Sequence, residues 1–588
     1  MKRLLSIVIA GILAGFTACT DILDSAPYNK PASSTMWTTE NLTEMGIAGV
    51  YQVLRIQNFE GHYDIYGYYA YDCLGTIGMQ HEVEPILRSA TNTSNSMFSE
   101  HWRRLYEGVH RANDAIANIP VKSPVSDERK RCLVAEAKFL RAWCYYRLNE
   151  LFRGVPIYLE PIIVEECIKT QNTEDEVWEQ IIKDLTDCVN EPNLPDRDAV
   201  TARVSKGAAY ALMGKVYMQQ HQWENAAAAF SKVGECGYKL FQGGYKELFT
   251  EANERCEEMI FSIQNTTDVG YGGNTQWYLG TNSAYGSGWN TFLPSPRGVD
   301  LYENADGTPF NWDDVIPGYN DMNPAYREVF FIRDTKKNNE EISEAVTSAV
   351  ETRLNGLPEE IRALYLPEGN EARIRKAYLN RDPRLEMTVI TPYSDFLGWI
   401  SGTTVDIMLT HRWPYVDRNG DLWSERRTMY YLMYRKFVYE GVNTIIARDR
   451  IGTDDPLIRY ADVVLQWAEA LVELNRLDEA AEKVNMVRGR TSVNMPPVKY
   501  ADQAELRAKV RKERRVELFG EGYSFFDDMR WRSWKEDKFT EGNGNLHAWG
   551  QVATTAYTWL GDHLYIFPVP ASEVEKNPNL KKTPGWTY

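Results

Sequence analysis

The chain has 588 residues, of which 43% are hydrophobic and 25% are charged. These values are typical of a globular protein and argue against disorder. The formal net charge of −17 argues against nucleic acid as a partner, because its phosphate groups would be repelled. Tyrosine (35 residues) and tryptophan (17 residues) are abundant, as expected for a protein that binds carbohydrate or peptide.

The N-terminal segment predicts export and a lipid anchor. Two basic residues precede an apolar run from Leu4 to Phe16, which is shorter than the roughly 20 residues of a membrane-spanning helix and is typical of a signal peptide. The run leads into Thr17-Ala18-Cys19, which resembles a lipobox, so we expect residues 1–18 to be removed and Cys19 to be acylated. Several acyl chains, at about 0.8 kcal/mol per buried methylene, make such an anchor effectively permanent. The alternative is plain secretion, with Cys19 as an incidental thiol.

Helices are predicted next along the chain. Thr39 is a plausible cap for a helix that starts at Glu40, and apolar residues recur at helical spacing in Ala135–Leu151 and Val177–Val189. Two later segments match each other in the manner of tetratricopeptide repeats. Small residues at Gly214/Ala468 and Ala226/Ala480 would let paired helices approach closely, beside large residues at Tyr217/Leu471 and Phe230/Val484. Any other helical hairpin would show the same pattern.

A long segment of different composition separates these helices. Gly, Asn, Ser, Thr and aromatic residues dominate Val269–Pro296, which lacks helical periodicity and predicts loops. We therefore predict a mainly α fold in one domain, residues 19–588. A tetratricopeptide-like repeat scaffold occupies about 40–236 and 455–535, and a loop-rich insertion at about 237–454 forms the ligand face.

The sequence offers no catalytic or metal-binding motif. Without Cys19, seven cysteines remain, and none forms a CxxC pair, so neither a disulfide framework nor a zinc site is predicted. The eight histidines are scattered, and HExxH, GxSxG and phosphate-binding or dinucleotide-binding glycine motifs are missing. We predict no cofactor and no enzymatic activity.

Several blocks, in order, resemble the SusD/RagB family of surface nutrient-binding lipoproteins of Bacteroidetes-type bacteria. One such block alone would be weak, whereas the ordered set is specific. The blocks are Cys19–Asp24, Arg111–Ile116, Ala135–Ala142 through Gly154-Val155-Pro156, Arg511–Leu518 through Gly520-Glu521-Gly522 to Asp527–Trp531, Phe567–Pro570 and Asn577–Leu580.

The resemblance implies an outer-membrane, surface-exposed lipoprotein with a helical fold around four tetratricopeptide units. It also implies a partner, a SusC-like TonB-dependent transporter that the lipoprotein covers as a lid, and a glycan ligand. The Arg/Glu-rich stretch 511–521 is predicted to form a structural ion-pair network rather than a catalytic site.

Aromatic residues beside polar ones are the predicted ligand contacts, because a ring buries the C–H face of a sugar while polar groups bind its hydroxyls. A first cluster lies at His62–Asp72 and a second at Asn274–Asn290. At both clusters, core packing is the competing interpretation. The predicted ligand-binding residues are Tyr71, Asp72, Trp277, Tyr278, Tyr285, Trp289, Tyr393 and Trp399.

Two other functions stay open at this point. Aromatic residues also bind peptides, so a peptide-binding member of the same transport system is the first alternative. The second is an exported glycoside hydrolase, which needs two carboxylates facing each other across a sugar bond, and no motif singles out such a pair.

Overall fold

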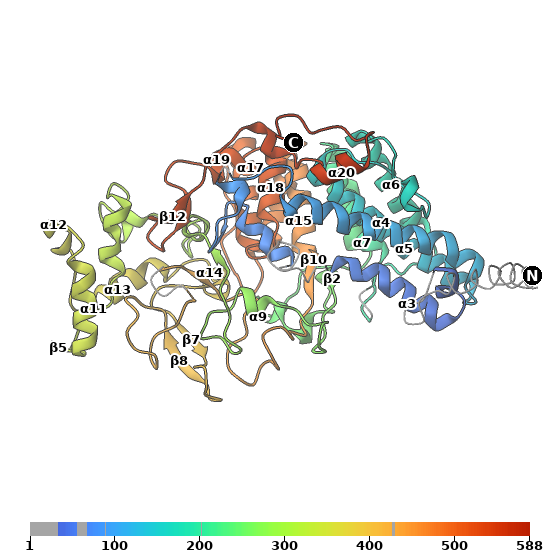
Figure 1. Cartoon of the computed structure of the whole chain (residues 1–588). Coiled ribbons are helices and arrows are strands. Elements are labelled where there is room, and N and C mark those ends of the chain that lie inside the picture. Colours follow the sequence, from blue (N-terminus) through green and yellow to red (C-terminus); the bar gives the residue numbers. More distant parts are fainter. Residues whose placement is uncertain (1–32, 56–66, 89, 201–202, 426–429) are drawn as a thin grey trace, which may run out of the picture.

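The computed structural model describes residues 33–55, 67–88, 90–200, 203–425 and 430–588. The predicted signal peptide and Cys19 lie outside these residues. Figure 1 shows paired helices stacked from the N-terminal end to the middle of the molecule, and loops with short helices and strands beyond and beneath them. Among the described helices, none combines the length and apolar character needed to cross a membrane.

Long helices build the first part of the structure. They pack in chain order, α4 on α5, α5 on α6 and α7 on α8, while α15 packs on both α16 and α17. This mainly helical, repeat-like arrangement confirms the predicted fold class. The helices are α3 (Glu40–Tyr51), α4 (Ser96–Lys122), α5 (Asp127–Phe152), α6 (Glu174–Asn190), α7 (Lys206–Gln219), α8 (Trp223–Glu235), α15 (Tyr460–Glu473), α16 (Leu477–Arg488), α17 (Gln503–Glu517), α18 (Ser524–Trp531) and α19 (Trp534–Lys538).

Local capping fixes where several helices begin. The Thr39 hydroxyl accepts a hydrogen bond from the Leu42 amide at 3.1 Å, as the sequence predicts. Thr173 and Glu176 cap α6 reciprocally, so this helix begins one turn before the predicted apolar stretch. α5 begins at Asp127, eight residues before the predicted start at Ala135. The prediction missed these first turns because they are charged and carry no apolar stripe.

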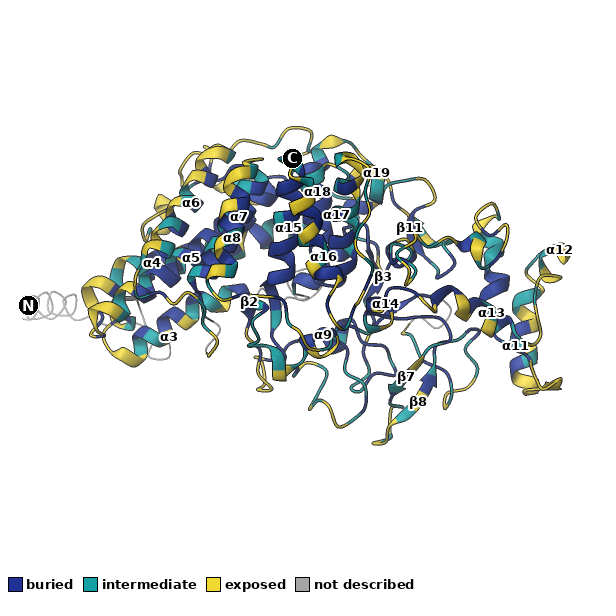
Figure 2. Ribbon diagram, turned by 180° about the vertical axis from the view of Figure 1, so that it is seen from behind, coloured by how far each residue is buried: buried dark blue, intermediate teal, exposed yellow. Residues whose placement is uncertain are grey.

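Two helical hairpins that are distant in sequence lie side by side. A Cβ atom on Gly214 of α7 would collide with the Phe230 ring of α8, so the close contact between these helices requires glycine. Ala468 and Ala480 play the same part between α15 and α16, where both are fully buried. α8 packs directly on α15, which is buried along nearly its whole length (Figure 2). The two predicted repeat segments therefore form one continuous array.

The insertion leaves and rejoins this array through a pair of antiparallel strands, β2 and β10, with Ile263 opposite Asp455. Between them the chain is mostly irregular, although the 11-residue helix α11 was not predicted. The short elements are β2 (Met259–Ile263), α9 (Thr275–Tyr278), β3 (Phe292–Pro294), α10 (Pro296–Val299), β4 (Lys336–Lys337), β5 (Glu340–Glu341), α11 (Glu344–Leu354), α12 (Glu359–Arg362), α13 (Asn370–Arg375), α14 (Arg384–Thr388), β6 (Val389–Ile390), β7 (Asp395–Gly398), β8 (Ile407–Thr410), β9 (Met433–Tyr434) and β10 (Asp455–Arg459).

Smaller elements complete the two ends of the described chain. Near the start, β1 pairs antiparallel with β3 of the insertion, and near the end β11 pairs with β12. The additional elements are α2 (Ser33–Met36), β1 (Gly78–Gln80), β11 (Gly544–Leu546), β12 (Val552–Ala556) and α20 (Ala571–Lys576).

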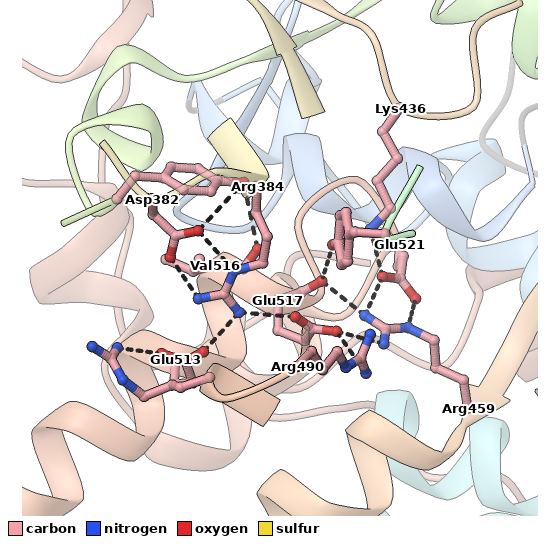
Figure 3. Close-up of polar contacts among 12 residues, drawn as sticks. Asp382, Arg384, Lys436, Arg459, Arg490, Glu513, Val516, Glu517 and Glu521 are labelled. Atoms are coloured by element: carbon pink, nitrogen blue, oxygen red, sulfur yellow. Dashed lines mark hydrogen bonds and ion pairs between the residues drawn. The ribbon is translucent and has the colours of Figure 1, made fainter. Parts of the chain in front are cut away.

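A buried set of ion pairs, here called the ion-pair joint, ties the insertion to the helical array (Figure 3). Glu517 at the end of α17 lies 2.7 Å from Arg459 of β10 and 2.8 Å from Arg384 of α14. Lys436 of the insertion lies 2.6 Å from Glu521. The joint comprises Glu258, Asp382, Arg384, Lys436, Arg459, Arg490, Glu513, Glu517 and Glu521.

The side chains of the joint are almost completely buried, so each charge depends on its partners rather than on water. Burial alone would raise the pKa of Glu517, but Arg490, Arg459 and Arg384 hold it below its usual range. The Arg/Glu-rich stretch is thus a structural network, as predicted from the sequence.

Candidate functional site

Three aromatic rings at α9 form the group we call the α9 aromatic group: Trp277, Tyr278 and Trp289. Trp277 and Tyr278 stack nearly parallel, with ring centroids 5.2 Å apart. Trp289 stands edge-on to both, at 5.0 Å from Trp277 and 5.9 Å from Tyr278. Tyr278 is buried and Trp277 is half-buried, whereas Trp289 is 42% exposed. Trp289 is therefore the member of the group that can meet a ligand.

Buried amides hold this loop in place. The side chain of Gln276 is fully buried, and its Nε2 donates to the carbonyls of Tyr285 and Tyr439, while its Oε1 accepts the Tyr439 amide at 2.8 Å. The Trp289 amide donates to the Trp277 carbonyl at 2.7 Å, which fixes the edge-on geometry. A loop held by buried amide hydrogen bonds of this kind presents a ring without a large ordering cost on binding.

Tyr285, in the loop after α9, and Trp399, just after β7, form a second and smaller aromatic contact. Their ring centroids are 5.7 Å apart, edge to face, and both residues are partly exposed. The Trp399 amide donates to the Ser283 carbonyl at 2.7 Å, which ties β7 to the α9 loop. The structure thus places five of the predicted residues in two groups of contacting rings, Trp277 with Tyr278 and Trp289, and Tyr285 with Trp399.

The described part of the first predicted cluster lies in the core. Residues 62–66 of this cluster fall outside the described residues, but Tyr71 is 7% exposed, and its ring stacks on Phe525 and contacts Phe526. Its hydroxyl is hydrogen bonded to His101. A ligand could reach this ring only by displacing the residues packed on it, so Tyr71 is left out of the proposed site.

Asp72 is equally inaccessible. Its carboxylate accepts the amides of Gly520 at 2.9 Å and Ser524 at 3.0 Å, and burial raises its pKa to about 7 despite these bonds. Gly520 and Gly522 have positive φ angles, a conformation that favours glycine and that turns the Gly520 amide toward Asp72. The segment of the Gly520-Glu521-Gly522 motif therefore binds Asp72, which is about 450 residues earlier in the chain, and Asp72 has a structural role.

Tyr393 is also a core residue. It is 4% exposed, and its hydroxyl donates to the Phe331 carbonyl at 2.8 Å. With its polar group satisfied inside the protein and its ring covered, Tyr393 offers a ligand no surface, and it too is left out of the proposed site.

Sequence reasoning missed several residues at this face. The guanidinium carbon of Arg448 lies 4.3 Å from the centre of the Trp277 ring and 5.4 Å from that of Trp289. Trp423, whose amide donates to the Ser283 hydroxyl at 2.8 Å, packs edge-on against Tyr415 at 4.5 Å. Both lie more than 130 residues after α9 on chain without periodicity, so no local signal identified them.

The exposed aromatic face suits the binding of a ligand. The described residues include no group of three or more His, Cys, Asp or Glu side chains that could hold a metal ion. A surface hollow of about 290 Å³ beside α5 is lined by charged and aliphatic residues and offers no ring on which a sugar could stack. The exposed ring of Trp289, with neighbouring amide and guanidinium groups, is the feature that fits a ligand with an apolar face and polar edges.

Known proteins share both the sequence and the fold of this chain. The model of the SusD family matches residues 257–586, which is more than half of the chain. A second family model, described as starch-binding and associating with the outer membrane, matches residues 21–218. A SusD-like protein of Formosa agariphila, P25, is 24% identical over 96% of this chain and 95% of its own length.

Solved structures agree. A SusD-like carbohydrate-binding protein of Bacteroides fragilis is 25% identical, with a TM-score of 0.71 over 93% of this chain and all of that one. A laminarin-binding SusD-like protein is 22% identical, with a TM-score of 0.62 over 94% of this chain and all of that one. Because a family model covers more than half of the chain and the fold agrees over nearly all of it, this protein belongs to the SusD family.

Proposed function

We propose that this protein is a cell-surface lipoprotein that binds a glycan at the α9 aromatic group and delivers it to a TonB-dependent outer-membrane transporter. The observation that carries the binding half of this proposal is Trp289, an exposed ring on a loop fixed by buried amides. Family membership supports it, as do similar structures whose names record carbohydrate and laminarin binding.

The energetics of this face suit reversible capture. An aromatic plate that buries one sugar face contributes on the order of 1–2 kcal/mol, at about 25 cal/mol per Å². Two or three such plates with hydrogen-bonding partners give roughly millimolar to micromolar binding. Trp289 is the first plate, and the partly exposed rings of Tyr285, Trp399 and Trp423 supply candidates for further plates. Such an affinity retains a polymer at the cell surface yet releases it for transport.

Replacing Trp289 tests the glycan-binding site. W289A should migrate faster than wild type in native gels that contain the polysaccharide ligand, because the stacking surface is lost. Since the Trp289 ring is partly exposed, the melting temperature of W289A should stay close to that of wild type. Trp223, a partly exposed tryptophan at the start of α8, provides the matched control, and W223A should migrate as wild type does. Equal retardation of W289A and wild type would place the ligand elsewhere.

The alternative hypothesis is that the same aromatic rings bind a peptide. If W289A alters binding to peptide mixtures while no glycan retards the wild-type protein, the ligand is a peptide and the transport role is otherwise unchanged. Incubation of pure protein with polysaccharide tests the proposal that it carries out no chemistry. The release of reducing ends would instead support a glycoside hydrolase, which requires a facing pair of carboxylates.

The anchor and the partner are tested separately. C19A should appear in the soluble fraction of cells that lack the transporter, because the acyl chains are lost, and the purified variant should bind glycan as wild type does. Affinity purification of the anchored wild-type protein from outer membranes should recover a TonB-dependent transporter. Retention of C19A in membranes without that transporter would contradict the proposed anchor.

A further inference from the structure

Two exposed aromatic rings lie on the stretch of chain that packs beside a short basic segment. Tyr271 is 56% exposed and Trp289 is 42% exposed. The segment 448–451 packs beside the chain that carries both rings, since the Gly273 amide donates to the Ile451 carbonyl at 2.7 Å and a Cβ atom on Gly272 would meet the Arg450 backbone. We call the set formed by Tyr271, Trp289, Arg448 and Arg450 the aromatic–arginine strip.

Arg448 is held in a fixed position within this strip. Its guanidinium carbon lies 4.3 Å from the centre of the Trp277 ring, on which Tyr278 also stacks. Its Nη1 donates to the Ser287 carbonyl at 2.6 Å. A guanidinium has five N–H donors, and within the described chain Arg448 uses one of them. The guanidinium carbon lies 5.4 Å from the centre of the exposed Trp289 ring.

Within the described parts of the chain, neither arginine of the strip forms an ion pair at close range. No carboxylate of a described residue lies within 4 Å of the Arg448 or Arg450 guanidinium, although Asp449 and Glu425 are near enough to influence the pKa of Arg448. Arg435 of the insertion, by contrast, lies 2.6 Å from Glu440. Arg448 therefore has unused charge-assisted donors near the Trp289 ring, and Arg450 follows it two residues later along the chain.

We infer that the ligand is an anionic glycan, whose carboxylate or sulfate groups bind Arg448 and Arg450 while its sugar rings stack on Trp289 and Tyr271. This inference rests on the proposed glycan-binding function and names the chemical class of the ligand. A planar guanidinium fork matches the oxygen pairs of carboxylate and sulfate groups, and such charge-assisted bonds are stronger than bonds to sugar hydroxyls. A neutral glycan would leave the two charges without partners.

The test compares neutral and anionic polysaccharides on the full mature protein at 0.15 M salt, where charges beyond about 8 Å are screened. Laminarin and dextran are the neutral probes, alginate and polygalacturonate carry carboxylates, and carrageenan and fucoidan carry sulfate esters. Dissociation constants are measured for wild type, R448Q/R450Q, R448K/R450K and W289A. Arg476, an exposed arginine at the α15–α16 turn, supplies the matched control R476Q.

We expect wild type to bind polysaccharides of one anionic class and R448Q/R450Q to bind them about tenfold to a hundredfold more weakly. R448K/R450K should recover part of the affinity, because charge is kept and the fork is lost, and R476Q should match wild type. Whether the carboxylated or the sulfated probes respond identifies the anion.

Two results would overturn the inference, and they differ in what they say of the proposed function. If W289A weakens binding of a neutral glycan while R448Q/R450Q leaves every dissociation constant unchanged, the glycan-binding function stands and the anionic ligand is refuted. If wild type binds none of the six polysaccharides, both proposals fail together.

Discussion

Replacing Glu517 by glutamine tests whether the ion-pair joint holds the ligand-bearing insertion on the helical array. Glu517 is fully buried and lies 2.7 Å from Arg459, 2.8 Å from Arg384 and 3.2 Å from Arg490. E517Q keeps the shape of the side chain but removes the negative charge that these three guanidinium groups share.

The size of the effect follows from the partners that remain. Removing one member of a buried ion pair costs about 3–5 kcal/mol, because the other charge is left in a low-dielectric environment. In E517Q, Arg384 still contacts Asp382 and Glu513, and Arg459 still contacts Glu258 and Glu521. We therefore expect a loss near the lower limit, about 3 kcal/mol in the free energy of unfolding.

Urea unfolding followed by circular dichroism measures this loss, which should lower the transition midpoint by up to about 1 M. Limited proteolysis shows which region is destabilised, since weakening the joint should expose the insertion to cleavage before the helices are cut. Glu482, on the surface of α16 beside Lys483, is the matched control, and E482Q should behave as wild type does. If E517Q unfolds at the wild-type midpoint, the joint does not hold the insertion.

Three further changes probe the array, the joint and the site loop. Gly214→Leu would drive a side chain into Phe230 and should cost about 1–3 kcal/mol or more in thermal unfolding, whereas a wild-type melting temperature would refute the tight α7–α8 contact. Burial opposes ionisation of Glu517, but its arginines lower the pKa, so its stabilising effect is present above about pH 4 and is lost on acidification. The unfolding free energy of E517Q should therefore fall less steeply with acid than that of wild type. Gln276→Ala should speed hydrogen exchange in residues 274–290 and weaken glycan binding although Trp289 is intact, and unchanged exchange would mean that the amide does not hold the loop.

Much of the helical array can be predicted from the sequence because its determinants are local. The Thr39 cap and the apolar stripes of α5 and α6 fix those helices within single segments. Small residues at Gly214 and Ala468 indicate close helix pairs, because the pattern repeats at the same spacing in each hairpin. The charged first turns of α5 were not predicted because they carry no apolar stripe. α11 was not predicted because its stripe of Val346, Val350 and Leu354 is short and is surrounded by irregular chain.

The ligand face shows the opposite case. The sequence by itself determined that aromatic residues gather at α9, and the ordered motifs determined the family. It could not separate Tyr71, which is packed against Phe525, from Trp289, which is exposed, because burial of a ring on irregular chain depends on contacts hundreds of residues away. For the same reason only the tertiary structure placed Arg448 against Trp277, although 171 residues separate them along the chain. Local periodicity determines a helix, whereas long-range packing alone decides which aromatic rings face a ligand.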